Sequence, residues 1–139
     1  MSARFLKIAV VYLAIGVSMG LYMGITHQFA LHPVHAHINL LGWASLALVG
    51  IIYHLYPEAA KTRLARIHFW MHNLGLPAFM IGLAFLLAGH EAFVVVVAIS
   101  SMVTGMGLVV FVVNVWMHVH DADPAVRTRP GVPNWPVVQ

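Results

Sequence analysis

Apolar residues run along this chain in four long stretches, without the strict alternation that is typical of strands. The stretches cover about residues 5–26, 37–56, 67–88 and 92–117. Each has roughly the 20 residues that a helix needs to cross the hydrocarbon core of a bilayer. Because backbone groups inside lipid must be hydrogen-bonded within the protein, we expect helices there. The pattern predicts an all-α integral membrane protein.

Short connections join the four stretches, at residues 27–36, 57–66 and 89–91. Connections this short place consecutive helices antiparallel to each other, which predicts an antiparallel four-helix transmembrane bundle over residues 1–120. The last segment, 121–139, contains four prolines and is interpreted as a Pro-rich cytoplasmic tail outside the bundle.

Composition supports the membrane interpretation. Of the 139 residues, 61% are hydrophobic and 8% are charged, whereas a soluble domain has about 25% charged residues. These values exclude an ordinary soluble domain, a disordered chain and a nucleic-acid-binding protein. The chain has no cysteine, which excludes disulfides, thiolate zinc sites and iron–sulfur clusters.

The cationic residues predict an orientation. In a four-span arrangement they all fall on one side of the membrane: Arg4, Lys7, Lys61, Arg63, Arg66, Arg127 and Arg129. Lysine and arginine are enriched in cytoplasmic segments. We therefore expect both termini in the cytoplasm, with the bacterial inner membrane as the location.

Glycines mark a surface for close helix packing in the first span. Gly16, Gly20 and Gly24 repeat at every fourth position, and this spacing lets another helix approach closely. Two interpretations follow: the strip packs against another helix of the same chain, or it forms a homodimer interface.

Histidine is unusually frequent, with ten residues. Ionisable residues within spans commonly serve a function, and neutral imidazole is the commonest metal ligand. His37 and His72 are the strongest candidates. Counting along the second and third spans from their connection places His54 level with His72, and His37 level with His90. The same counting separates His37 from His72 by about 20 Å, at 1.5 Å per residue.

Two segments carry a resemblance to a known family. Residues 35–43 read His-Ala-His-Ile-Asn-Leu-Leu-Gly-Trp, and residues 53–58 read Tyr-His-Leu-Tyr-Pro-Glu. This pattern resembles the second helix of subunit I in haem–copper oxidases, especially nitric oxide reductases and cbb3-type oxidases. There, a histidine followed two residues later by asparagine begins an apolar helix that ends near Tyr-x-x-Pro. The resemblance covers about residues 31–76.

The resemblance implies that His37 is an axial ligand of a haem b. An oxidase subunit I has about twelve spans, a second haem and a copper ion held by three histidines. Four spans cannot rebuild that reaction centre, so we do not expect an autonomous oxidase or reductase. The chain is similar to small four- to five-span proteins that are grouped with subunit I.

Three functions remain open from the sequence. The first is a b-type haem protein for electron transfer, haem sensing or haem handling, with ligands among His37, His72, His54 and His90. The second is a copper or zinc protein for metal binding or transport, which would use the cluster His32, His35, His37 and His90. The third is an accessory structural subunit. The sequence does not identify a redox partner.

Overall fold

The computed structural model describes residues 1–120, and this part of the chain is almost entirely helical. The predicted tail, residues 121–139, lies outside the described residues. The elements in chain order are α1 (Ser2–Thr26), α2 (His32–His37), the π-helix η1 (Ile38–Ser45), α3 (Leu46–Leu55), α4 (Pro57–Lys61), α5 (Arg63–Leu87), the 3₁₀ helix η2 (Glu91–Phe93) and α6 (Val94–His118).

Four helices are long and apolar enough to cross a membrane: Ser2–Thr26, His32–Leu55, Arg63–Leu87 and Glu91–His118. They confirm the four helices expected from the apolar stretches. Their bounds differ most at the second and third helices, which begin at His32 and Arg63 and not at the expected residues 37 and 67. Pro33 explains the earlier start of the second helix, because proline is favoured in a first helical turn, where its missing N–H leaves no bond unmade.

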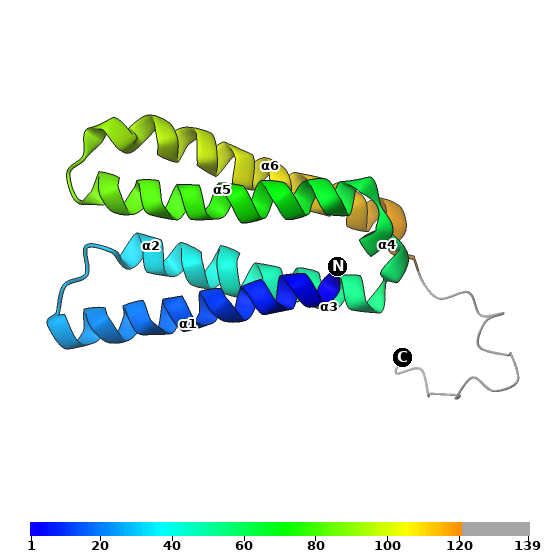
Figure 1. The fold of residues 1–139 in the computed structure, drawn as a ribbon, viewed down its shortest axis with the longest axis horizontal. Coiled ribbons are helices and arrows are strands. Elements are labelled where there is room, and N and C mark those ends of the chain that lie inside the picture. Colours follow the sequence, from blue (N-terminus) through cyan, green and yellow to red (C-terminus); the bar gives the residue numbers. More distant parts are fainter. Residues whose placement is uncertain (121–139) are drawn as a thin grey trace, which may run out of the picture.

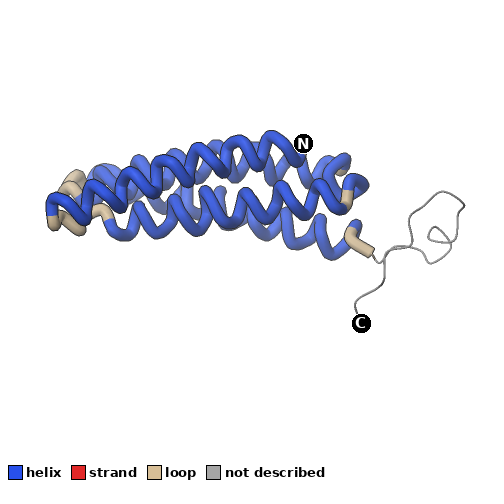
Figure 2. Tube along the Cα trace, turned by 90° about the horizontal axis from the view of Figure 1, so that it is seen from below, coloured by secondary structure: helices blue, strands red, loops and turns tan. Residues whose placement is uncertain are grey.

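The long helices form two pairs. In Figure 1, α1 lies beside α2, η1 and α3, and α5 lies beside α6. Figure 2, turned by 90°, shows the helices side by side along one long axis with the connections at the two ends. Residue contacts between backbones are concentrated within each pair. The two pairs meet mainly through their side chains.

Glycines allow the close approach within the first pair. A Cβ atom added at Gly16 would lie 2.5 Å from the Asn39 side chain, and one added at Gly42 would lie 2.5 Å from the Tyr12 ring. Gly20 faces the His35 ring, 3.1 Å from such an added atom, whereas nothing lies within 4 Å of Gly24.

The glycine strip of the first span therefore packs within the chain at its first two positions. The third position, Gly24, faces no neighbour in the part of the chain described.

The second pair is built in the same way. A Cβ atom at Gly75 on α5 would lie 2.7 Å from Thr104 Oγ1 and 3.1 Å from the Thr104 backbone nitrogen of α6. A Cβ atom at Gly107 on α6 would lie 3.1 Å from the Cβ atom of Met71. Both seams bring backbones to a separation that only glycine permits.

A polar network fastens the two pairs at one end. The Asn114 Nδ2 of α6 donates to Tyr53 Oη at 3.0 Å and to the Ala59 carbonyl at 2.9 Å. Thr62 Oγ1 donates to Asn114 Oδ1 at 2.8 Å and accepts from the Ala65 N–H at 3.0 Å, which caps α5. All the polar atoms of the buried Asn114 side chain that face α3, α4 and α5 are thereby paired.

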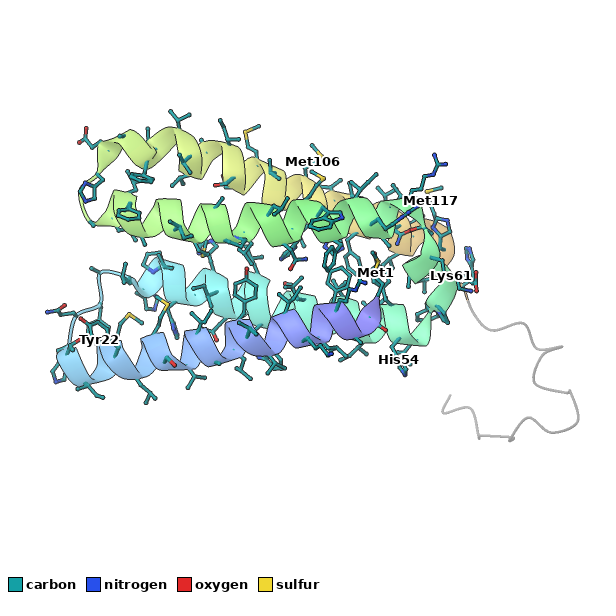
Figure 3. All side chains as sticks on the ribbon, in the orientation of Figure 1. Met1, Tyr22, His54, Lys61, Met106 and Met117 are labelled. Atoms are coloured by element: carbon teal, nitrogen blue, oxygen red, sulfur yellow. The ribbon has the colours of Figure 1, made fainter. Side chains whose placement is uncertain are left out.

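The described ends of the bundle differ in charge. Figure 3 shows Met1, His54, Lys61 and Met117 at one end and Tyr22 at the other. Arg4 and Lys7 lie in the first turns of α1, next to Met1, so they share the end that carries Lys61. Two other cationic residues that predicted the orientation, Arg127 and Arg129, lie outside the described residues.

Candidate functional site

A π-helix occupies the middle of the second long helix. Residues Ile38–Ser45 are wound with hydrogen bonds that skip five positions instead of four. Ser45 Oγ donates to the Leu40 carbonyl at 2.8 Å, also across five positions. Short π segments recur at functional sites. Here the Leu41 carbonyl, which belongs to this segment, is bonded to a side chain of α5.

His72 of α5 makes the contact with this carbonyl. Its Nε2 lies 3.0 Å from the Leu41 oxygen, and its side chain is fully buried. A carbonyl can only accept, so Nε2 carries the hydrogen, and Nδ1 of the neutral ring keeps the lone pair. This Nδ1 has no hydrogen-bond partner in the structure.

His68 lies one helical turn before His72, and it is also fully buried. Neither of its ring nitrogens has a partner. The two imidazole rings are perpendicular, with centroids 5.4 Å apart, and no hydrogen bond joins them. The two side chains therefore bring three unpaired ring nitrogens into one small region of the interior.

Aromatic rings surround His68. Phe5 of α1 is stacked on it at 5.4 Å, and Phe111 of α6 lies at 5.1 Å. Tyr53 of α3 contacts the same two phenylalanines, at 5.6 Å and 5.8 Å. Each of the four long helices thus contributes one ring to a closed set. We call Phe5, Tyr53, His68 and Phe111 the ring seam, because they join the two helix pairs.

The unpaired nitrogens are unusual for a folded interior. Burying a polar group without a partner costs free energy, and the large majority of such groups in proteins are hydrogen-bonded. In residues 1–120, the other buried side-chain atom without a partner is Asn73 Oδ1, which belongs to the residue after His72. The unpaired polar atoms of the described chain are therefore concentrated on one and a half turns of α5.

His37 lies in a different setting. It is half-buried, its Nδ1 is 2.7 Å from the Pro33 carbonyl, and its ring meets Phe79 of α5 edge-on at 5.3 Å. The carbonyl bond fixes the hydrogen on Nδ1 and leaves the lone pair on Nε2. Metal-ligating histidines are commonly oriented by such a bond through their other nitrogen.

The structure places the expected partners elsewhere. His54 is exposed, and Figure 3 shows its side chain pointing away from the bundle. His90 is exposed in the connection between α5 and α6, against Phe85 at 5.7 Å. His72 faces Leu41 and not His54, and His37 faces Phe79 and not His90.

The difference between the expected and the observed heights of these histidines has a local cause. The counting took the connection between the second and third spans as a symmetric loop. In the structure α4 crosses the end of the bundle, and α5 begins at Arg63, before the expected residue 67. Since His37 is level with Phe79, it is separated from His72 by seven residues of α5. This is about 10 Å along the helix and half the expected height, but still too far for one shared iron.

The expected cluster for copper or zinc is not assembled. Within residues 1–120, no three histidine, aspartate or glutamate side chains lie close enough to hold one metal ion. His32 and His90 are exposed, and the half-buried His35 packs over Gly20. The described histidines thus provide a buried pair and single residues rather than a three-ligand site.

An apolar groove lies between α1 and α5. Its volume is about 480 Å³. The lining residues are Ile8, Val11, Tyr12, Ile15, Ile38, Asn73, Pro77, Met80 and Ile81. Pro77 interrupts the hydrogen bonds of α5 at this point, since proline has no N–H. Ile38, directly after His37, brings the groove next to the candidate ligand.

No known family, curated protein or solved structure matches this chain in the comparisons made. The resemblance to oxidase subunit I therefore stays a prediction that rests on the residues around His37.

The ligand candidate that sequence reasoning undervalued is His68. The signal was present, because His68 and His72 are four residues apart, and residues at that spacing share one helix face. The sequence could not show that this face is the one covered by Phe5 and Phe111, because that depends on how the two helix pairs pack.

Proposed function

We propose that the protein is an integral membrane protein with four antiparallel spans and both termini in the cytoplasm of a bacterium. The four long apolar helices support insertion in a bilayer. The concentration of the described cations at the end that carries Met1 and Lys61 supports the orientation. A reporter fused after Gln139 should be active in the cytoplasm, and an extracytoplasmic signal would reverse the orientation.

We further propose that the protein binds haem b without a covalent bond, with His37 as an axial ligand. The observation that carries this proposal is the bond from His37 Nδ1 to the Pro33 carbonyl, which leaves Nε2 available on a half-buried ring. An absent cysteine excludes thioether attachment. Imidazole on a helix in an apolar environment suits a b-type haem.

An apolar groove lies beside His37 in the sequence. Its lining includes the next residue, Ile38, but neither His37 nor Phe79, which the His37 ring contacts. Two further donors could help to hold the haem: the buried Met80 thioether, which packs in the same cluster as Ile38, and His37 of a second copy. Haem with His/Met and His/His ligation differs in its visible and near-infrared bands.

Bound haem would supply a one-electron carrier, so electron transfer and haem sensing or handling are the roles we propose. The chain would contribute the ligand, a water-poor groove and the orientation across the bilayer. The accessory-subunit interpretation predicts no pigment at all. The described residues give no specific support to a three-histidine copper or zinc site.

The test is the visible spectrum of the purified protein. We expect a Soret band, a pigment that acidified acetone extracts, and iron close to the haem content. His37→Ala should lose most of the Soret absorbance. His54→Ala is the matched control, because His54 is also a helical histidine but exposed and pointing outward, and it should leave the spectrum unchanged. A wild-type spectrum in His37→Ala would overturn the ligand assignment.

A further inference from the structure

The His68–His72 pair offers ligands of a defined chemical type. Each neutral imidazole has one N–H and one lone pair. The N–H of His72 is bound to Leu41, so its Nδ1 lone pair is the free group. His68 has a free lone pair as well, on whichever nitrogen lacks the hydrogen. Two neutral nitrogen donors thus lie within one fully buried region.

Their spacing suits one shared ion. Histidines at positions i and i+4 of a helix form a known metal-binding pair. Metal–imidazole bonds are about 2 Å long, so two nitrogens bound to one ion lie at most about 4 Å apart. Ring centroids 5.4 Å apart are compatible with that separation, because each nitrogen lies on the rim of its ring. The Leu41 carbonyl holds one ring in place, as an outer partner commonly does for a ligand.

The apolar surroundings of the His68–His72 pair favour an ion of low charge. The rings of Phe5 and Phe111 contact the fully buried His68 ring. Within residues 1–120 no carboxylate joins a group of three metal-binding side chains, so the pair has no anionic ligand. Zinc requires about four ligands, and a divalent charge in an apolar interior without a counter-ion is costly. A monovalent d¹⁰ ion needs only two nitrogen donors and has a smaller cost of burial than a divalent ion. Imidazole is a suitable ligand for copper.

We propose that His68 and His72 bind one copper(I) ion between the two helix pairs. The site is independent of the proposed haem, because it uses neither His37 nor the groove. Its position near the start of α5 places it under the first turns of α1, where Phe5 covers it.

The experiment is a copper(I) titration of the purified full chain in detergent, under anaerobic reducing conditions, against a chromogenic copper(I) chelator. We expect one equivalent of copper(I) to be withdrawn from the chelator. His68→Leu and His72→Leu should each lower the affinity at least 100-fold. His54→Leu is the control and should bind as the parent does, since its ring lies outside the bundle.

A second measurement does not depend on the variants folding. Silver(I), a spectroscopically silent analogue of copper(I), should shift the imidazole ¹⁵N resonances of two histidines of the parent protein and of no others. Helix content and elution volume identify any variant that fails to fold. Absence of copper(I) binding by the parent, or unchanged binding by a folded variant that carries both His68→Leu and His72→Leu, would overturn the proposal. A buried water molecule would then be the partner of these nitrogens.

Discussion

The seams within the helix pairs and the ring seam between them are built from opposite kinds of residue. Within the pairs, glycines such as Gly42 and Gly75 remove the side chain, so that a neighbouring helix lies at van der Waals distance. Between the pairs, Phe5, Tyr53 and Phe111 meet through large rings. Backbones are close in the first case and well separated in the second.

This difference shows which of the two kinds of interface can accommodate a functional polar side chain. A glycine seam brings the facing helix so close that only the side chains already packed there fit, such as Asn39 at Gly16 and Thr104 at Gly75. A seam of rings has a thickness set by side chains, and one ring can be an imidazole without changing that thickness. The unpaired nitrogens of His68 occur in the ring seam for this reason.

The largest expected effect comes from filling a glycine seam. Gly75→Leu would place a Cβ atom 2.7 Å from Thr104 Oγ1 and 3.1 Å from its backbone nitrogen, so α5 and α6 would have to separate. Overpacking costs about 1–3 kcal/mol, and more where backbone must move. We expect a large drop in the thermal midpoint in detergent, or no folded protein.

Gly105→Leu is the control for that experiment, because nothing lies within 4 Å of a Cβ atom at Gly105. It should leave the midpoint close to that of the parent. Equal destabilisation by both variants would show that the seam does not set the cost, because leucine is a better helix former than glycine at either position.

A moderate effect of opposite sign is expected in the ring seam. His68→Leu replaces a buried imidazole with unpaired nitrogens by an apolar side chain of similar size among Phe5 and Phe111. Removing an unsatisfied buried group should raise the free energy of unfolding by roughly 1 kcal/mol. The measurement is chemical or thermal unfolding of metal-free protein, with exposed His54→Leu as the neutral comparison. A clear loss of stability would mean that the His68 nitrogens have a partner in the metal-free protein.

The smallest effect on folding is expected at Gly24, the glycine of the first span that faces no neighbouring helix. Gly16→Ile should weaken the fold itself, since Asn39 occupies the space, whereas Gly24→Ile should leave folding unchanged. A homodimer through this strip would have to use Gly24. We therefore expect Gly24→Ile to lower the oligomeric mass in detergent if the protein is a dimer. An unchanged dimer mass would remove the strip as its interface.

The sequence predicted the four helices because twenty apolar residues in a row leave few alternatives in lipid. It also identified His72 as buried, from its place inside an apolar stretch. It could not predict the partner of His72, because that depends on where α5 starts and on the turn of α4, and both are set by the Thr62 cap and the Asn114 network.

The expected pairing of His37 with His90 is not found in the structure, for a related reason. Sequence counting measures height along a helix, but it assumes a uniform winding. The π-helix at Ile38–Ser45 breaks that assumption in the middle of the second span. The apolar pattern does not mark such a segment, since residues 46–52 continue the same apolar stretch.

Because of the π-helix, the number of residues in this span determines which of its side chains face the interior of the bundle. Wider winding over Ile38–Ser45 changes the rotational phase between the residues before it and those after it. With this phase difference, His37 contacts Phe79 of α5 and Tyr53 contacts Phe111 of α6. Winding the same eight residues as an ordinary α-helix would rotate one half of the span against the other. The sites at the two ends of this helix are thus coupled by the number of residues between them, so that an insertion or deletion would disturb them more than a conservative substitution.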